Sequence, residues 1–283
     1  MVKILTDSTN DLPLDVIKKL DIEVIPLYVN FGNESLKDGV DIKTEELYKR
    51  VSSNGVLPKT AAITIGDFET VFKKYLDMGY ELVYTGISGA MSSTLNNARI
   101  AIENLDAQDK AYAIDSKNLS TGIGLLLFKA CKDRDLGLNA REIAANMEKN
   151  TDYVLSQFAI EQMEYLHKGG RCSGVARFAA TVLRIKPIIE VRGGKMDVQA
   201  KPIGKIKVAL DRMLKQLISD KDRLDKDHII VTHSMADESA KYLIAKIKEE
   251  FNDVDILETN AGCVISSHCG PGTIGILYMV NSK

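Results

Sequence analysis

The segment of residues 85–94, TGISGAMSST, is the part of the sequence best suited to chemistry, because it joins glycines to hydroxyl side chains. It follows an apolar run at 81–84 that predicts a buried strand. It precedes residues 95–105, whose apolar spacing predicts a helix. Ser92, Ser93 and Thr94 would therefore stand at the start of this helix, where hydroxyls accept hydrogen bonds from free backbone N–H groups. Those N–H groups also attract a phosphate or a carboxylate, so the segment predicts either a capped helix or an anion site.

Two kinds of chemistry fit the serine in the middle of this segment. In the first, a Gly-x-Ser-x-Ala stretch around Ser88 is a nucleophile elbow, and Asp115 and His268 complete a serine hydrolase triad in the order Ser, Asp, His. In the second, Ser88 and the hydroxyls that follow bind an anionic head group, His268 is a hydrogen-bond donor, and no covalent step occurs. An elbow serine runs directly into its helix, whereas the best capping residues here come four positions later. The pattern therefore favours binding.

Three further segments are expected at the same site. Thr60 lies in a stretch at 57–62 that Pro58 predicts to be irregular. His268 lies in residues 266–272, SSHCGPG, where glycines such as Gly270 permit tight turns close to a ligand. The hydroxyls and carboxylate of residues 7–9 follow the first predicted strand and should open on the same sheet edge.

Composition excludes several classes of protein. The chain has 283 residues, 45% hydrophobic and 27% charged, with a net charge of −2, which gives no reason to expect nucleic acid as a partner. Its four cysteines lack C-x-x-C spacing, which indicates reduced thiols in a cytoplasmic protein. Neither a signal peptide nor an apolar run long enough to span a bilayer is visible. Zinc is not expected, since Cys263, His268 and Cys269 lack a second pair, and no nucleotide-binding glycine motif occurs, so we expect no cofactor.

Periodicity predicts two α/β domains with the ligand between them. Residues 1–150 alternate strand and helix, which predicts a mostly parallel, doubly wound sheet. The expected strands are 2–5, 22–31, 81–84 and 111–114, and the expected helices are 13–20, 44–52, 68–78, 95–105, 122–134 and 140–149. The helix at 122–134 is unusually apolar and should be buried.

Residues 151–283 predict a second α/β domain with a mixed or antiparallel sheet, because a hairpin at 186–200 stands beside single strands and helices. The expected strands are 153–160, 228–232, 254–258 and 275–280, and the expected helices are 163–167, 178–183, 208–218 and 239–251. The apolar stretches 178–183 and 185–191 could line a tunnel for a ligand's tail, or could simply form core.

Several motifs in this order resemble the DegV family of bacterial fatty-acid-binding proteins over nearly the whole chain. The matching positions are Thr6-Asp7-Ser8-Thr9 with Asp11-Leu12, Pro58-Lys59-Thr60, Ile87-Ser88, Ser92-x-Thr94 with Ala98, Ile114-Asp115-Ser116, Tyr165-Leu166-x-Lys168-Gly169-Gly170-Arg171, Lys186-Pro187-Ile188, Lys207 and His268-x-Gly270-Pro271-Gly272. Each motif is weak alone, but their order and spacing together are specific.

The resemblance implies that the two domains enclose one long-chain fatty acid such as palmitate. Thr60 and Ser92 match the residues that hold its carboxylate, the C-terminal segment returns His268 to the same site, and Arg171 is expected near the head group. In the family a separate fatty acid kinase phosphorylates the bound acid, and the acyl phosphate feeds phospholipid synthesis. The resemblance thus implies a lipid carrier rather than an enzyme.

Three positions differ from the family pattern. Ala61 follows Thr60 where the family often has serine, and Ser93 replaces a glycine between Ser92 and Thr94. Ile203 replaces the arginine that precedes the kinase-facing helix. The resemblance therefore covers the ligand site more closely than the kinase-recognition surface. The basic residues Lys201, Lys205 and Lys207 are either a solvated face or a docking surface for an acidic partner.

Overall fold

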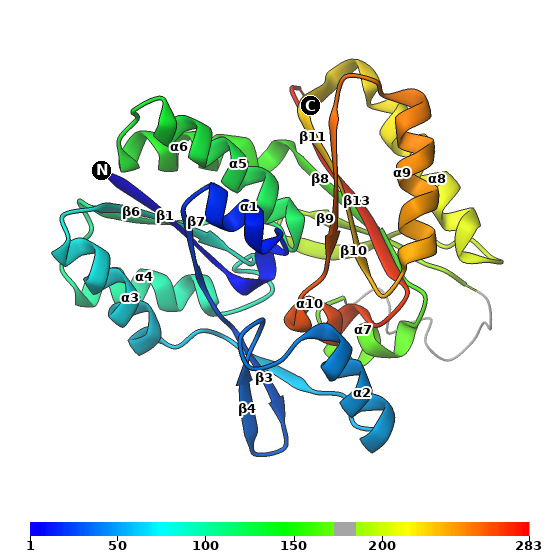
Figure 1. Cartoon of the computed structure of the whole chain (residues 1–283), viewed down its shortest axis with the longest axis horizontal. Helices are drawn as coiled ribbons and strands as arrows, with labels where there is room; N and C mark the ends of the chain where they lie inside the picture. The colour runs from blue at the N-terminus through cyan, green and yellow to red at the C-terminus, as the bar shows by residue number, and fades with distance from the viewer. Residues whose placement is uncertain (173–184, 283) are drawn as a thin grey trace.

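Two β-sheets of different kinds are packed side by side, with helices around them (Figure 1). The computed structural model describes residues 1–172 and 185–282. The expected helix at 178–183 lies outside the described residues. The sheets agree with the predicted α/β class, while the domain boundary near residue 150 stays a prediction.

The first sheet is parallel, with the strand order β2-β1-β6-β7. Its strands are β1 (Val2–Asp7), β2 (Ile22–Ile25), β6 (Glu81–Gly86) and β7 (Ala111–Asp115). Helices cover both faces, which confirms the doubly wound arrangement (Figure 1). On one face lie α1 (Leu14–Lys19), α5 (Thr121–Asp135) and α6 (Ala140–Asn150), and on the other lie α3 (Ile65–Asp77) and α4 (Thr94–Asn104). An Asn139–Glu142 capping box starts α6, as the sequence indicates.

The expected single strand at 22–31 is wrong. Pro26 interrupts it, since proline has no N–H and a fixed φ, and the next amide, that of Leu27, donates to Ser8 Oγ. Strand β2 stays in the parallel sheet, whereas β3 (Tyr28–Phe31) joins a small antiparallel sheet with β4 (Glu34–Lys37) and β5 (Lys59–Ala61). The expectation that residues 57–62 are irregular is wrong for residues 59–61, because β5 pairs with β3 and places Thr60 opposite Val29. Proline biases the preceding residue toward extended backbone, which suits the approach to a strand.

The second sheet is mixed, as predicted, with the order β10-β9-β8-β13-β11-β12. Its strands are β8 (Val154–Ala159), β9 (Ile188–Arg192), β10 (Lys195–Ala200), β11 (Leu224–Ser234), β12 (Asp255–Asn260) and β13 (Thr273–Val280). Neighbours are antiparallel except for β11 and β12. Alternate residues of β13 face opposite ways. Ile276 and Tyr278 pack with α8 (Ile206–Ser219) and α9 (Asp237–Glu250), while Leu277 packs on the side of α5.

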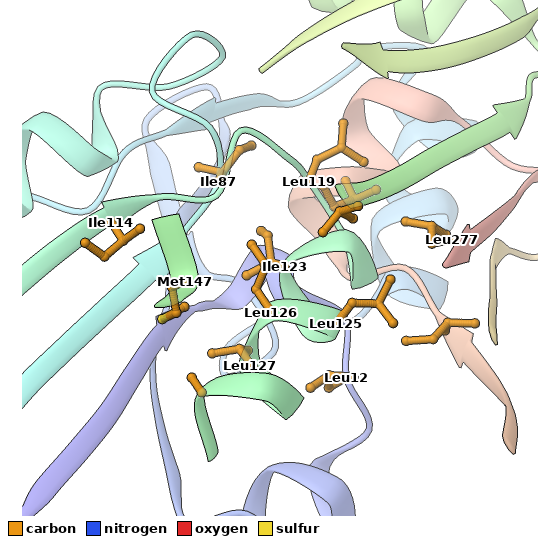
Figure 2. Close-up of a cluster of buried hydrophobic side chains, with 14 of the residues drawn as sticks. Leu12, Ile87, Ile114, Leu119, Ile123, Leu125, Leu126, Leu127, Met147 and Leu277 are labelled. Atoms are coloured by element: carbon orange, nitrogen blue, oxygen red, sulfur yellow. The ribbon is translucent and has the colours of Figure 1, made fainter. Parts of the chain in front are cut away.

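Helix α5 is buried between the two sheets, as its apolar sequence predicts. Figure 2 shows Ile123, Leu125 and Leu126 projecting from this helix in different directions. They belong to a cluster that contains Ile114 from the first sheet and Leu277 from the second. One apolar core therefore connects the two halves through α5.

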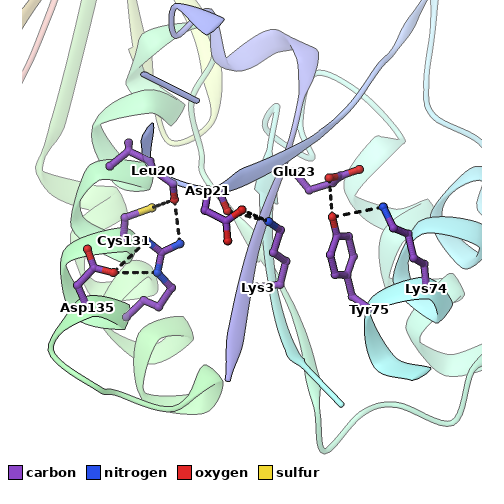
Figure 3. Close-up of polar contacts among 9 residues, drawn as sticks. Lys3, Leu20, Asp21, Glu23, Lys74, Tyr75, Cys131 and Asp135 are labelled. Carbon is purple, nitrogen blue, oxygen red and sulfur yellow. Dashed lines mark hydrogen bonds and ion pairs between the residues drawn. The ribbon is translucent and has the colours of Figure 1, made fainter. Parts of the chain in front are cut away.

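Polar contacts at the edge of the first sheet fasten the turn between α1 and β2 (Figure 3). Lys3 Nζ, from the centre of the sheet, pairs with Asp21 Oδ1 at 2.6 Å. Arg134 Nη1 of α5 donates to Leu20 O at 2.9 Å, and Tyr75 of α3 donates to Glu23 Oε2 at 2.6 Å. Helices on opposite faces are thus bound to the same edge of the sheet.

The remaining helices lie near the junction of the halves. They are α2 (Thr44–Asn54), α7 (Met163–Gly169) and α10 (Cys263–Cys269). Short 3₁₀ turns elsewhere in the chain are η1 (Ser8–Asn10), η2 (Thr151–Tyr153) and η3 (Lys221–Arg223). The sequence reading expected a glycine-rich loop around His268. Instead His268 lies in the last turn of α10, and only the Gly-Pro-Gly that follows is a turn.

Two buried carboxylates of the first half cap the N-terminus of α10. Gly262 N–H donates to Asp11 Oδ1 at 2.8 Å, and the Cys263 and Val264 amides donate to Asp38 at 2.8 and 3.3 Å. These are the orphan N–H groups of a helix start, so the first half of the chain satisfies them. Burial raises the pKa of Asp11 to about 8, and it also raises the pKa of Asp38.

The raised pKa of Asp11 predicts a pH-dependent stability. The folded chain keeps a proton that the unfolded chain releases near its ordinary value of 3.8, so this contribution to stability is lost as pH rises from about 4 to about 8. Asp11→Asn keeps an oxygen for Gly262 and provides an NH₂ group for Ser120 Oγ, now 2.5 Å from Asp11 Oδ2. We expect urea unfolding to show that, between pH 5 and pH 8, the free energy of unfolding of the variant rises relative to that of the wild type by a few kcal/mol.

The exposed Asp15→Asn in α1 is the matched control and should leave the pH profile unchanged. An Asp11→Asn profile parallel to the wild type would show that Asp11 is not the titrating group.

Candidate functional site

A cavity of about 760 Å³ lies where the carboxyl edge of the first sheet meets α10. Its walls come from distant parts of the chain, including β5, the β6–α4 turn, α4, β10 and α10. The lining residues are Leu27, Thr60, Ala61, Ala62, Ile87, Gly89, Ala90, Met91, Ser92, Ser93, Leu95, Asn96, Arg99, Asp115, Leu119, Arg171, Met196, Val264, Ile265, His268 and Cys269. Polar and apolar side chains share this space, so it suits an amphiphilic ligand.

Thr60 and His268 meet in this cavity although they lie 208 residues apart in sequence. Thr60 Oγ1 is 2.8 Å from His268 Nε2. The other ring nitrogen, Nδ1, is buried and has no hydrogen-bond partner among the described residues. It faces Gly169, where an added Cβ would come within 2.5 Å of it. Only glycine therefore lets α7 approach the imidazole this closely.

The imidazole of His268 is held neutral. Burial, together with the charge of Arg171, lowers its pKa to about 4. A neutral imidazole has one N–H, and with that proton on Nε2 it donates to Thr60 Oγ1. The Thr60 hydroxyl proton is then available to a ligand in the cavity. A carboxylate, which only accepts hydrogen bonds, matches such a donor.

The three hydroxyls at the start of α4 do not act alike. Ser92 Oγ accepts from Thr94 N–H at 3.2 Å and lies 2.8 Å from Thr94 Oγ1, whereas the N-cap residue Ser93 makes no side-chain capping bond. Ser92 and Ser93 line the cavity, but Thr94 is fully buried and is not among the lining residues. Ser92 therefore presents its hydroxyl both to the helix and to the cavity.

The serine hydrolase triad is not assembled. Ser88 is fully buried and its Oγ accepts from Ala90 N–H at 3.2 Å. Asp115 Oδ1 accepts from the Gly89 and Lys117 amides at 3.2 and 2.9 Å. His268 is bound to Thr60 instead, and within the described part of the chain no hydrogen bond joins any two triad members. The tight turn after β6 uses Ser88 to close itself, so this serine is neither exposed nor part of the cavity lining.

Asp7 has a supporting role that the sequence did not indicate. Its Oδ2 accepts from Ile87 N–H at 2.9 Å and from Tyr84 OH at 3.0 Å, which fixes the β6–α4 turn beside the cavity. Gly86 allows this approach, because a Cβ there would lie 2.0 Å from the carboxylate. Asp7 is thus buried under the site rather than lining it.

The other expected site residues are divided between the cavity and its surroundings. Arg171 lines the cavity, and its Nη1 donates to Gly169 O at 2.8 Å. Gly270 does not line it; a Cβ at this position would come 2.7 Å from the ring of Tyr165, and its φ of +76° favours glycine. The stretch 185–191 contributes the core strand β9 and no lining residue.

The cavity also includes residues that sequence reasoning missed. Asn96 and Arg99 lie on α4, which begins directly after Ser92 and Ser93, and Met196 comes from β10. The spacing of Asn96 and Arg99, three apart on one helix face, was the available signal. Met196 had none, because only the fold brings β10 to the first half.

The basic residues Lys201, Lys205 and Lys207 lie outside the cavity, on the β10–α8 connection and the first turn of α8. All three are exposed, and Lys207 Nζ lies 4.9 Å from the centre of the Tyr242 ring. Ile203 between them is 67% exposed. Their role stays a prediction.

Metal chemistry has no visible ligand set in this part of the molecule. Among the residues that the structure describes, no three His, Cys, Asp or Glu side chains are grouped to hold an ion. A helix long and apolar enough to cross a bilayer is likewise absent from the described residues.

The fold and the site define an α/β protein with two large sheets and a cavity, lined by polar and apolar side chains, between its halves. Comparisons with known proteins identify its family. The model of the DegV family of uncharacterised proteins matches residues 1–281. A DegV domain-containing protein of Clostridium acetobutylicum is 35% identical over 278 residues and 98% of each chain. The chain belongs to the DegV family.

Two other relatives are described by what they bind. A fatty acid-binding protein of Thermotoga maritima is 30% identical over 281 residues, which cover 97% of this chain and 96% of that one. A solved structure of a DegV family protein from Thermus thermophilus, described as binding fatty acid, matches with a TM-score of 0.91 at 26% identity over 99% of both chains.

The low pKa of His268 can be measured directly. We expect an NMR titration to show His268 neutral down to about pH 5, because burial and Arg171 oppose its protonation. Arg171→Leu should raise this pKa, while Arg50→Leu, a distant arginine on α2, should not. A wild-type midpoint near the ordinary value of 6.5 would contradict the described environment.

Proposed function

We propose that this protein binds one long-chain fatty acid without transforming it. The carboxylate would accept hydrogen bonds from Thr60 and Ser92, with His268 orienting the Thr60 hydroxyl and Arg171 supplying positive charge nearby. The apolar lining residues would surround the tail. The observation that carries this proposal is the pairing of Thr60 with a neutral His268, at 2.8 Å, in a cavity that Ser92 also lines.

The apolar and polar parts of the lining would contribute differently to binding, the first to affinity and the second to the orientation of the ligand. Burying a sixteen-carbon tail contributes about 0.8 kcal/mol per methylene, on the order of 11 kcal/mol before association costs of several kcal/mol. Each hydrogen bond to the carboxylate adds roughly 1.5–3 kcal/mol. The tail therefore supplies most of the affinity, and the polar end fixes which way the ligand lies.

Removing one hydroxyl should weaken binding without abolishing it. We expect Ser92→Ala and Thr60→Val each to lower the affinity for palmitate by about tenfold to a hundredfold, measured by calorimetry, since one charge-assisted hydrogen bond is lost. Ser52→Ala on the exposed side of α2 is the control and should bind like the wild type. Complete loss of binding in a folded Ser92→Ala protein would contradict this division.

We further propose that the protein presents its cargo to a separate fatty acid kinase, as the family resemblance implies. The exposed side chains of Lys201, Lys205 and Lys207 would dock an acidic surface of that kinase. Arg171 and Arg99 are polar lining residues that are exposed to solvent. The polar end of the cavity would therefore face the kinase, which would receive the carboxylate. Ile203, in place of the family arginine, would make this docking weaker than in relatives that keep it.

Charge reversal should separate docking from lipid binding. We expect Lys201→Glu, Lys205→Glu and Lys207→Glu together to abolish association with a fatty acid kinase in a pull-down while leaving lipid content unchanged. Ile203→Arg should strengthen the association. Reversal of Lys18, Lys19 and Lys248, exposed lysines of α1 and α9, is the control. A loss of lipid in the first triple variant would mean that this surface supports the fold instead.

A further inference from the structure

A second, much smaller pocket continues the main cavity toward the second sheet. The two share Leu119, Ile265 and Cys269 in their linings. The small pocket has a volume of about 30 Å³, far below the 760 Å³ of the main cavity. Neither Thr60 nor Ser92 lines the small pocket, so a chain whose head lies at those hydroxyls would reach it past Leu119 and Ile265.

The far wall of this pocket is formed by the middle of the second sheet. Phe158 of β8 stands opposite Gly275 of β13, and Leu277 follows two residues later. The backbone is closely packed here, since a Cβ on Gly275 would lie 3.0 Å from Gln157 O. Figure 2 shows Leu277 and Leu119 on the same side of the apolar cluster. The Phe158 ring is therefore the largest removable group at the end of the space.

Polar groups close the pocket in the remaining direction. His233, Ser234 and Ala261 separate it from an open groove of about 700 Å³ on the other side of α10. Ser234 Oγ is engaged by Tyr48 OH at 2.6 Å and Ser266 Oγ at 2.8 Å, and His233 Nδ1 accepts from Ala236 N–H at 3.2 Å. An alkyl chain that passed between them would have to break these buried hydrogen bonds, which is costly.

From this geometry we infer that the small pocket receives the methyl end of the acyl chain and that Phe158 sets the greatest chain length that the protein accepts. This inference rests on the proposed function. Leu119 stands at the passage between the two spaces and controls entry to the end pocket. Each methylene that is buried adds about fourfold to the affinity, so affinity should rise with chain length until the pocket is full and then stop rising.

The test is a series of dissociation constants for saturated fatty acids from ten to twenty carbons. Phe158→Leu and Phe158→Ala should move the break point to longer acids, with about a fourfold gain for the first acid beyond the wild-type limit. Leu119→Phe should have the opposite effect, lowering the affinity for long acids and leaving the affinity for short acids unchanged. Phe72→Leu is the matched control, because Phe72 is also a buried phenylalanine but packs between α3 and the other face of the first sheet.

The results distinguish this inference from the function on which it rests. An unchanged break point in folded Phe158 and Leu119 variants overturns the inference alone, as does a break point that moves with Met91→Ala and not with Phe158→Leu. Affinity that keeps rising past twenty carbons in the wild type also overturns it, because the chain would then pass Ser234 into the groove. Failure of the wild type to bind any fatty acid overturns the proposed function itself.

Discussion

The capping of α10 by two buried carboxylates is the contact on which the cavity depends. Asp11 and Asp38, both from the first half of the chain, accept hydrogen bonds from the free amides at the start of this helix. Burying carboxylates is costly, and the raised pKa values report that cost, but each carboxylate also satisfies helix N–H groups that would otherwise be orphaned. The helix so anchored brings His268 to Thr60 and places Ile265 in the cavity wall.

Two different environments at the cavity would let the proposed fatty acid bind in one direction only. At one end, burial keeps His268 neutral, so it works as a hydrogen-bond donor rather than as a cation. At the other end the lining is mostly apolar, and its polar members His233 and Ser234 already have hydrogen-bond partners. An amphiphile reversed in this space would bury its carboxylate among carbon atoms and leave the hydroxyls unused. For the proposed fatty acid, the chemistry of the walls would therefore set the orientation without any covalent bond.

Local patterns in the sequence predicted most strands of the two large sheets and most of the longer helices, but not the short elements at the junction of the halves. The alternation of strands and helices predicted the parallel sheet, and the apolar run in α5 predicted its burial. The break at Pro26 and the strand that carries Thr60 were missed because short antiparallel pairing depends on a partner distant in sequence. Helix α10 was missed because its seven residues are capped by Asp11 and Asp38 rather than by a residue of its own. Sequence reasoning and the family resemblance placed Thr60 and His268 at one site, but local periodicity contains no signal for the hydrogen bond between them.

The most direct test of the account is native mass spectrometry of the purified protein, followed by denaturation and extraction of what it carries. The account predicts one fatty acid per chain, either retained from the cell or taken up when palmitate or oleate is added. A protein that is empty as purified, and stays empty with both acids while remaining folded, would contradict the central claim that this cavity is a fatty acid site.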